Sequence, residues 1–158
     1  MSKKSNKHPG ELLVCRNPKA TQAYDIEERI EAGLVLTGSE VKSLRLRRAD
    51  LEGAYASIDG GEMVLHKMHI APYELAGAFG HEPKRSRKLL VNRREIQRWE
   101  GRLATRGYTI VPLAVYFKGG WAKVELGLAK GRKVKDRREE LRREADLREA
   151  RAAMGKGR

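Results

Sequence analysis

Two pairs of alternating apolar and polar runs constrain the fold of this chain more than any other feature. The first pair spans Tyr55 to Lys67 around Asp59-Gly60-Gly61, and the second spans Tyr108 to Ala129 around Lys118-Gly119-Gly120. Alternation with a period of two is typical of strands that bury one face, and glycine accepts the positive φ of a tight hairpin turn. The sequence therefore predicts two antiparallel hairpins, the last strand of which buries Ala122, Val124, Leu126 and Leu128 and exposes Lys123 and Glu125.

Two earlier segments also have strand patterns. A short apolar run extends from Leu12 to Cys15, and a longer alternating run extends from Tyr24 to Leu36. In the longer run the pattern predicts a buried side made of Ile26, Ile30, Ala32, Leu34 and Leu36 and a wet side made of Asp25, Glu27, Arg29 and Glu31.

Two helices are expected between the strands. Thr37 and Glu40 have the spacing of a capping box, so a short helix should follow, with Lys42 and Arg45 exposed beside Val41 and Leu44. A second helix should begin at Asn92, which has Glu95 three residues later, and should end near Gly107. Its predicted buried stripe consists of Ile96, Trp99 and Leu103.

Such a set of strands is most economically arranged as a closed barrel, because closure removes exposed edges from a small sheet. We therefore expect a mainly β protein, a six-stranded antiparallel barrel similar to oligonucleotide-binding folds with two or three short helices. Residues 12–129 are expected to form the barrel, residues 1–11 a flexible basic N-terminus, and residues 130–158 a basic C-terminal tail.

The tail has a composition that cannot form a core by itself. It holds 12 Lys and Arg residues, six Asp and Glu residues and no aromatic residue. Asp136 and Glu139 have capping spacing, and Glu139 with Arg143 is one of two favourable i,i+4 pairs, but each such pair contributes only about 0.2–0.5 kcal/mol. A helix is therefore expected on a binding surface and disorder in the free protein. A tail that only improves solubility is the alternative.

The charge of the chain predicts a polyanionic partner. The net charge is +13 and the pI is about 10.1, with +6 from the tail and +7 from the remainder. Nucleic acid is the leading partner, and RNA is favoured over duplex DNA because there is no helix-turn-helix pattern. A membrane partner is not expected, because the tail lacks the apolar face of an interfacial helix. The chain has no export signal or 18-residue apolar run, so a cytoplasmic location is expected.

No catalytic or metal-binding motif is evident. Cys15 is the only cysteine, which excludes an intrachain disulfide and a cysteine-based zinc cluster. His66 and His69 are three residues apart on an expected strand and should point to opposite faces. There is neither a P-loop nor a nucleophile elbow. We therefore expect no enzyme activity, no cofactor and no metal.

A basic cluster precedes the second helix. Four cations occupy five positions from Lys84 to Lys88, and the helix adds Arg93, Arg94, Arg98, Arg102 and Arg106. The cluster is either a solvated face or a phosphate path, and the basicity of the whole chain favours the second interpretation. Tyr24, Tyr73 and Phe79 are possible stacking planes for RNA bases.

Five segments, in order, resemble a known family. They are Ile30 to Leu34, GSEVKSLR from Gly38 to Arg45, RKLLVN from Arg87 to Asn92, GYTIVPL from Gly107 to Leu113, and LAKGRK from Leu128 to Lys133. Together they are similar to the SmpB family, the SsrA-binding proteins of bacterial trans-translation. The resemblance implies binding to transfer-messenger RNA and its delivery, with elongation factor Tu held indirectly through the RNA, to ribosomes stalled on truncated messages.

The resemblance also implies site residues. The family's RNA-binding positions fall on Asn17, Glu31, Leu90 and Asn92, and neighbouring residues complete a candidate RNA-binding set of Asn17, Lys19, Tyr24, Glu31, Lys42, Arg45, Arg87, Lys88, Leu90 and Asn92. From the residues alone, Glu31 is an ordinary surface acid, Leu90 a core residue and Asn92 an N-cap. A general RNA chaperone or a small ribosomal protein is the alternative function.

The same resemblance assigns the tail to the ribosome. The tail would enter the empty messenger channel near the decoding centre and contact it through Gly131, Arg132, Lys133, Lys135, Asp136, Arg137 and Arg138. Lys135 stands where many members carry an aromatic residue or histidine, so phosphate pairing is expected there in place of stacking. A monomer is expected.

Overall fold

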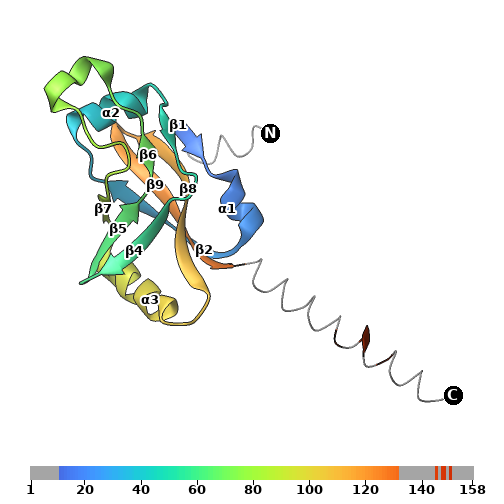
Figure 1. Ribbon diagram of the computed structural model, residues 1–158. Coiled ribbons are helices and arrows are strands. Elements are labelled where there is room, and N and C mark those ends of the chain that lie inside the picture. Colours follow the sequence, from blue (N-terminus) through green and yellow to red (C-terminus); the bar gives the residue numbers. More distant parts are fainter. Residues whose placement is uncertain (1–10, 132–144, 146, 149, 151–158) are drawn as a thin grey trace.

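The computed structural model describes residues 11–131 and, in the C-terminal segment, Ala145, Leu147, Arg148 and Ala150 (Figure 1). These last four residues are α-helical and exposed. Residues 1–10 of the expected flexible N-terminus, residues 1–11, lie outside the described residues, whereas Glu11 already belongs to the first strand.

The structure contains the strands and the two helices that the sequence patterns predict, together with further elements that they do not predict. The strands are β1 (Glu11–Arg16), β2 (Tyr24–Leu34), β3 (Ala49–Asp50), β4 (Tyr55–Asp59), β5 (Glu62–His66), β6 (His69–Ile70), β7 (Arg87–Leu90), β8 (Tyr108–Lys118) and β9 (Trp121–Gly131). The helices are α1 (Pro18–Ala23), α2 (Gly38–Arg45), the 3-10 helix η1 (Glu74–Phe79) and α3 (Arg93–Leu103). The elements that the sequence patterns do not predict include α1, β3, β6 and η1.

Six strands hydrogen-bond in a closed ring. Their order is β8, β4, β5, β7, β2 and β9, and β9 pairs again with β8. All these pairings are antiparallel. β1 lies outside the ring and pairs with residues 114–118 of β8, while β4 pairs with Ile110 of the same strand. The pairings therefore agree with the predicted six-stranded antiparallel barrel, to which β3 and β6 add a separate two-stranded ribbon.

Both predicted hairpins are confirmed. Gly60 and Gly61 join β4 to β5 with φ of 59° and 79°, and Gly119 and Gly120 join β8 to β9 with φ of 57° and 84°. These four positions lie in the left-handed region that favours glycine.

The long strand β2 departs from its predicted alternation. The pairing with β9 is shifted by a bulge between Ile26 and Glu28, so that Ile26 pairs with Ala129 and Glu28 pairs with Leu128. An extra residue reverses which side chains face inward. Ile30, Ala32 and Leu34 therefore belong to the barrel core, whereas Ile26 packs on the outside against a second cluster. The prediction that Ile26 shares the buried side of Ile30 is wrong for this reason.

The helices cover different parts of the barrel. Figure 1 shows α2 and α3 at opposite ends, where Leu44 of α2 and Trp99 of α3 are fully buried in the main core. The second cluster lies under α1 and consists of Ala20, Val111, Leu113 and Ala129 with Tyr24 and Ile26 packed against it. Each helix thus seals one apolar surface that the strands leave open.

Three element boundaries differ from the predicted ones. β2 ends at Leu34, and α3 ends at Leu103, so that Gly107, with φ of 94°, lies in the turn before β8. β9 continues to Gly131, which pairs with Tyr24. Lys130 and Gly131, assigned to the tail by the sequence, are therefore the last residues of the barrel.

Candidate nucleic-acid interface

Outward-facing residues of β2, β7, β8 and β9 lie together on one outer surface of the barrel. Gly33 pairs with both Leu90 of β7 and Lys123 of β9, Lys123 pairs with Tyr116 of β8, and Lys118 pairs with Trp121. The alternate residues of these strands, such as Ala32, Val124 and Phe117, lie in the core. We call the outward set the Glu31 face, which consists of Glu31, Gly33, Leu90, Tyr116, Lys118, Trp121, Lys123 and Glu125, the direct cross-strand partner of Glu31.

Glu31 is held at the centre of this face. The Tyr116 hydroxyl donates to Glu31 Oε2 over 2.5 Å, and Lys118 Nζ lies 3.4 Å from the same oxygen. Partial burial by itself would raise the pKa of Glu31, but these hydrogen bonds and the neighbouring lysines lower it. The carboxylate is therefore ionised, and with one third of the side chain exposed it retains acceptor capacity for N–H groups of a ligand.

Leu90 is a surface residue and not a core residue. Its side chain is 58% exposed, whereas the preceding Leu89 is buried. It lies across Gly33, where an added Cβ would come within 3.3 Å of Leu90 Cβ. The absence of a side chain at Gly33 allows this close approach, which places an exposed apolar group beside Glu31's strand.

Asn92 does not act as a side-chain cap. Its backbone carbonyl accepts from the amides of Glu95 (3.0 Å) and Ile96 (3.1 Å), but its exposed side chain makes no capping hydrogen bond. The helix therefore begins where predicted, and the amide of Asn92 remains available to a ligand.

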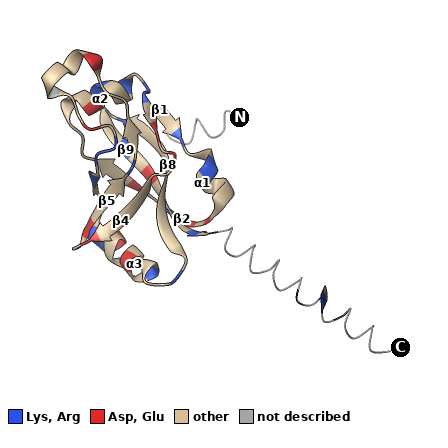
Figure 2. Ribbon diagram, in the orientation of Figure 1, with Lys and Arg blue, Asp and Glu red and all other residues tan. Residues whose placement is uncertain are grey.

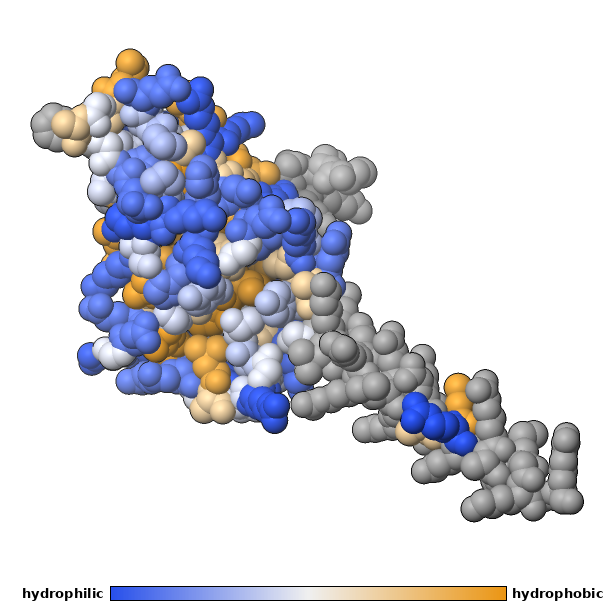
Figure 3. Space-filling view, viewed as in Figure 1, coloured by the Kyte–Doolittle hydropathy of each residue, from blue (hydrophilic) through white to orange (hydrophobic). Residues whose placement is uncertain are grey.

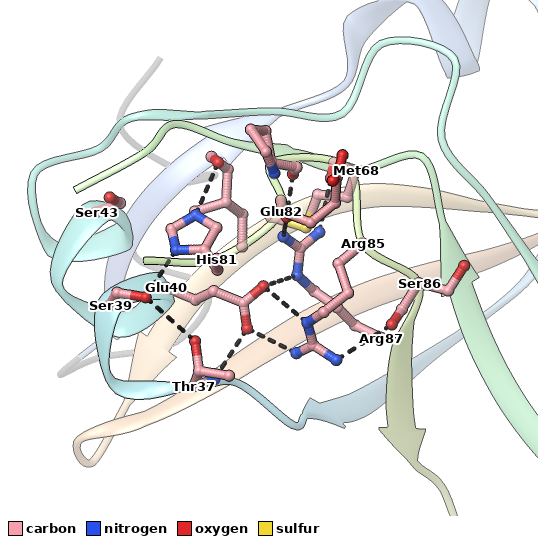
Figure 4. A network of polar contacts seen from close by, with 12 residues as sticks. Thr37, Ser39, Glu40, Ser43, Met68, His81, Glu82, Arg85, Ser86 and Arg87 are labelled. Atoms are coloured by element: carbon pink, nitrogen blue, oxygen red, sulfur yellow. Dashed lines mark hydrogen bonds and ion pairs between the residues drawn. The ribbon is translucent and has the colours of Figure 1, made fainter. Parts of the chain in front are cut away.

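Arg87 is not an RNA-binding residue, which corrects the prediction. It is fully buried, donates through Nε to Glu40 Oε2 over 2.5 Å, and donates through its other nitrogens to the carbonyls of Met68 (2.7 Å) and Pro83 (3.1 Å) (Figure 4). The strand places Arg87 and Leu89 inward and Lys88 and Leu90 outward. The guanidinium therefore connects α2, β7 and the loop before it.

Glu40 is the buried anion of this network. It accepts from the Thr37 amide over 2.9 Å, which confirms the predicted capping box, and also from Arg85 over 2.7 Å. Burial alone would raise the pKa of Glu40, but the bonds from Arg85, the Thr37 amide and Arg87 lower it to about 2. Beside it, Ser39 Oγ lies 2.8 Å from Nδ1 of His81, as Figure 4 shows.

Lys88 and three further candidates carry exposed charges. Lys88 pairs with Glu62 at 3.2 Å, and Lys19 of α1 pairs with Glu52 at 2.5 Å. Lys42 lies 5.5 Å from the centre of the Tyr73 ring, and Arg45 lies 4.8 Å from that of Phe117. Figure 2 shows such cations on α1, α2 and α3, so positive charge is spread over several surfaces. Of the proposed stacking planes, Tyr73 faces Lys42, and the side chain of Phe79 lies outside the described part.

Asn17 and Tyr24 lie at α1. Asn17 Nδ2 donates to the Pro112 carbonyl over 2.9 Å, and Tyr24 packs against the second cluster beside Ala20. Both residues therefore help to attach α1 to the barrel, and both remain partly exposed, so their contact with RNA stays a prediction.

Two arginines of α3 form surface ion pairs with acids of β2. Arg98 pairs with Glu28 at 2.8 Å, and Arg102 pairs with Glu27 at 2.7 Å, both on the bulged part of β2. Arg93 and Arg94, in the first turn beside Asn92, are exposed. Arg98 and Arg102 thus have acidic partners within the protein, whereas Arg93 and Arg94 are exposed to solvent.

Some residues of the Glu31 face were missed by sequence reasoning. Tyr116, Lys118 and Trp121 join the face only because β8 pairs with β9 in a register that is set by the Gly119-Gly120 turn. That turn was recognised in the sequence, so counting outward from it would have found them. The predicted tail contacts Arg132, Lys133, Lys135, Asp136, Arg137 and Arg138 lie outside the described residues.

Within the described part of the chain, no group of three or more His, Cys, Asp and Glu side chains could hold a metal ion. In the same part, every helix is too short or too polar to cross a membrane.

The family model described as "SmpB protein" matches residues 14–156, which is nearly the whole chain. The chain belongs to the SmpB family. Two curated SmpB relatives, both called SsrA-binding protein, are similar along nearly their full length. The one from Chloroflexus aurantiacus is 50% identical over 159 residues and covers 100% of this chain and 98% of its own. The one from Geobacter metallireducens is 49% identical over 145 residues and covers 92% and 95%.

A solved SmpB structure is also similar. It is described as "tmRNA-SmpB: a journey to the center of the bacterial ribosome", and it is 44% identical with a TM-score of 0.63 over 74% of this chain and 82% of that chain. The similarity covers both sequence and fold, so it supports the mainly β architecture found here.

Proposed function

We propose that this protein binds transfer-messenger RNA through its barrel and acts with that RNA in trans-translation on stalled ribosomes. The observation that carries the proposal is family membership over nearly the whole chain, together with a solved relative whose description names both the RNA and the ribosome. The Glu31 face gives this role a physical basis on the barrel.

The RNA-binding surface is centred on Glu31, Leu90 and Asn92. Glu31 is an ionised acceptor suited to base N–H groups of an unpaired loop, and a carboxylate would repel a phosphate at the same place. Exposed Leu90 provides an apolar contact for a base or ribose. Lys88, Lys118 and Lys123 flank these groups and attract the phosphates, with Lys19, Lys42 and Arg45 as more distant phosphate contacts.

The tail is proposed to contact the ribosome. Residues from Arg132 to Arg138 would enter the empty messenger channel near the decoding centre and become helical there. The ribosome and transfer-messenger RNA are the direct partners, and elongation factor Tu is an indirect partner through the RNA. We infer a noncatalytic, monomeric, cytoplasmic adaptor.

Competition binding tests this function. Labelled tRNA-like domain of transfer-messenger RNA should bind the purified protein at physiological salt and should not be displaced by an excess of bulk tRNA. A general RNA chaperone or a ribosomal protein would lose both RNAs together as salt rises. Equal displacement by bulk tRNA would therefore contradict the proposal.

A further inference from the structure

We propose that Trp121 is a stacking platform for an unpaired base of the bound RNA. This inference rests on the proposed function and extends it to a residue at the edge of the Glu31 face. The ligand group is one nucleobase next to the nucleotides that Glu31 and Leu90 contact.

The exposure of Trp121 has no structural explanation in the barrel. The side chain is 73% exposed at the start of β9, whereas Trp99 is fully buried in the core. Tryptophan is highly buried on average, and a large exposed ring that contributes little to a core is a common feature of binding sites. The space-filling view shows that hydrophilic residues cover most of the visible surface (Figure 3). Among the exposed large apolar residues of the described part, Trp121 is the only tryptophan, and Tyr55 is the only other aromatic residue.

The turn before Trp121 consists of two glycines, which have no side chains. Gly119 and Gly120 have positive φ, and a Cβ added at either position would meet no atom within 4 Å. The two turn residues next to Trp121 therefore carry no side chain that could cover the hairpin tip.

The neighbouring charges favour a nucleotide over a protein side chain. Lys118 is the cross-strand partner of Trp121, and Lys123 follows two residues later on the same face, about 7 Å along the strand. Lys118 also contacts Glu31, so the platform is continuous with the proposed RNA site. An aromatic side chain with two lysines nearby, and with an acceptor for base N–H groups on the same face, is a combination that suits single-stranded RNA.

Binding measurements on matched variants test the platform. Trp121→Ala should weaken binding of the tRNA-like domain by about 5- to 100-fold, the range for loss of one base stack, and Trp121→Phe should restore most of the affinity. Leu75→Ala is the control, because Leu75 is 85% exposed on η1, which is drawn in light green in Figure 1. Its affinity should equal that of the wild type.

Fluorescence provides a second readout. The wild-type emission should be quenched when RNA is added, whereas Trp121→Phe, which retains only buried Trp99, should show no change. An unaltered affinity of Trp121→Ala with an unquenched wild type would overturn the platform, as would a Phe variant as weak as the Ala variant. A wild type that does not bind the tRNA-like domain would overturn the proposed function as well, so the two failures are distinguishable.

Discussion

Glu40 and Arg87 form an ion pair of 2.5 Å in which neither side chain is exposed to solvent. The two residues are 47 positions apart in the chain and belong to α2 and β7. Leu90 and Asn92 follow Arg87 closely, so the pair fixes the strand that presents them to the outside. Arg87, one of the candidate RNA contacts in the sequence, thus stabilises the strand that carries Leu90.

Removal of the Glu40 charge should destabilise the fold strongly. Glu40→Gln leaves Arg87 buried without its anion, and breaking a buried ion pair typically costs about 3–5 kcal/mol. Arg85→Ala should cost clearly less, because that side chain is 37% exposed and Arg87 still neutralises Glu40. Urea unfolding of both variants measures the difference. Equal losses in the free energy of unfolding would contradict a larger contribution from the buried pair.

The same carboxylate should make stability depend on acid pH. Its folded pKa of about 2 lies below the ordinary value of 4.5, so its stabilising contribution is complete above about pH 5 and is lost as the pH falls toward 2. The free energy of unfolding should therefore fall more steeply between pH 5 and pH 2 in the wild type than in Glu40→Gln. Parallel curves for the two proteins would contradict the assigned pKa.

Neutralising Glu31 should impair RNA binding and leave folding intact. Glu31→Gln retains the shape of the side chain but loses the charged acceptor, and a hydrogen bond to a charged group is worth enough to predict a loss of about 10-fold or more in affinity. Glu74→Gln, on exposed η1, is the charge-matched control. Titration of labelled tRNA-like domain measures both, and equal affinities would remove Glu31 from the site.

Adjacent residues Arg87 and Lys88 should have separate effects. Lys88→Gln should weaken binding and reduce by about one the slope of log affinity against log salt, as expected when one phosphate contact is lost. Arg87→Lys should instead lower the melting temperature, because a lysine cannot reproduce the fork of hydrogen bonds to Glu40, Met68 and Pro83. A Lys88 variant with an unchanged salt slope would place that residue outside the phosphate path.

Local patterns in the sequence predicted much of the fold. The two glycine turns, the capping box at Thr37 and the buried stripe of α3 depend on residues close in the chain, and all are present. The bulge in β2 was not predictable in this way, because it depends on pairing with β9, about 100 residues later.

The candidate site shows the same division. Treating Lys84 to Lys88 as one basic cluster hid the strand alternation that buries Arg87 beside Leu89 and exposes Lys88 beside Leu90. The partner of Arg87 could not be inferred either, because Glu40 already had a local role in the helix cap. Exposure of Leu90 depends on its position opposite Gly33, which only the pairing of β2 with β7 reveals.

We propose that the barrel binds the RNA and that the tail acts on the ribosome. The structure sets the cut between them after Gly131, where β9 ends. The most direct measurement compares the full chain with a chain ending at Gly131, both for affinity to the tRNA-like domain and for tagging of peptides on ribosomes stalled on truncated messages. We expect the shortened protein to bind the RNA with nearly full affinity and to support no tagging. Glu31→Gln in the full chain should instead bind the RNA more weakly. Tagging that persists without the tail, or RNA binding that disappears with it, would contradict this division of roles.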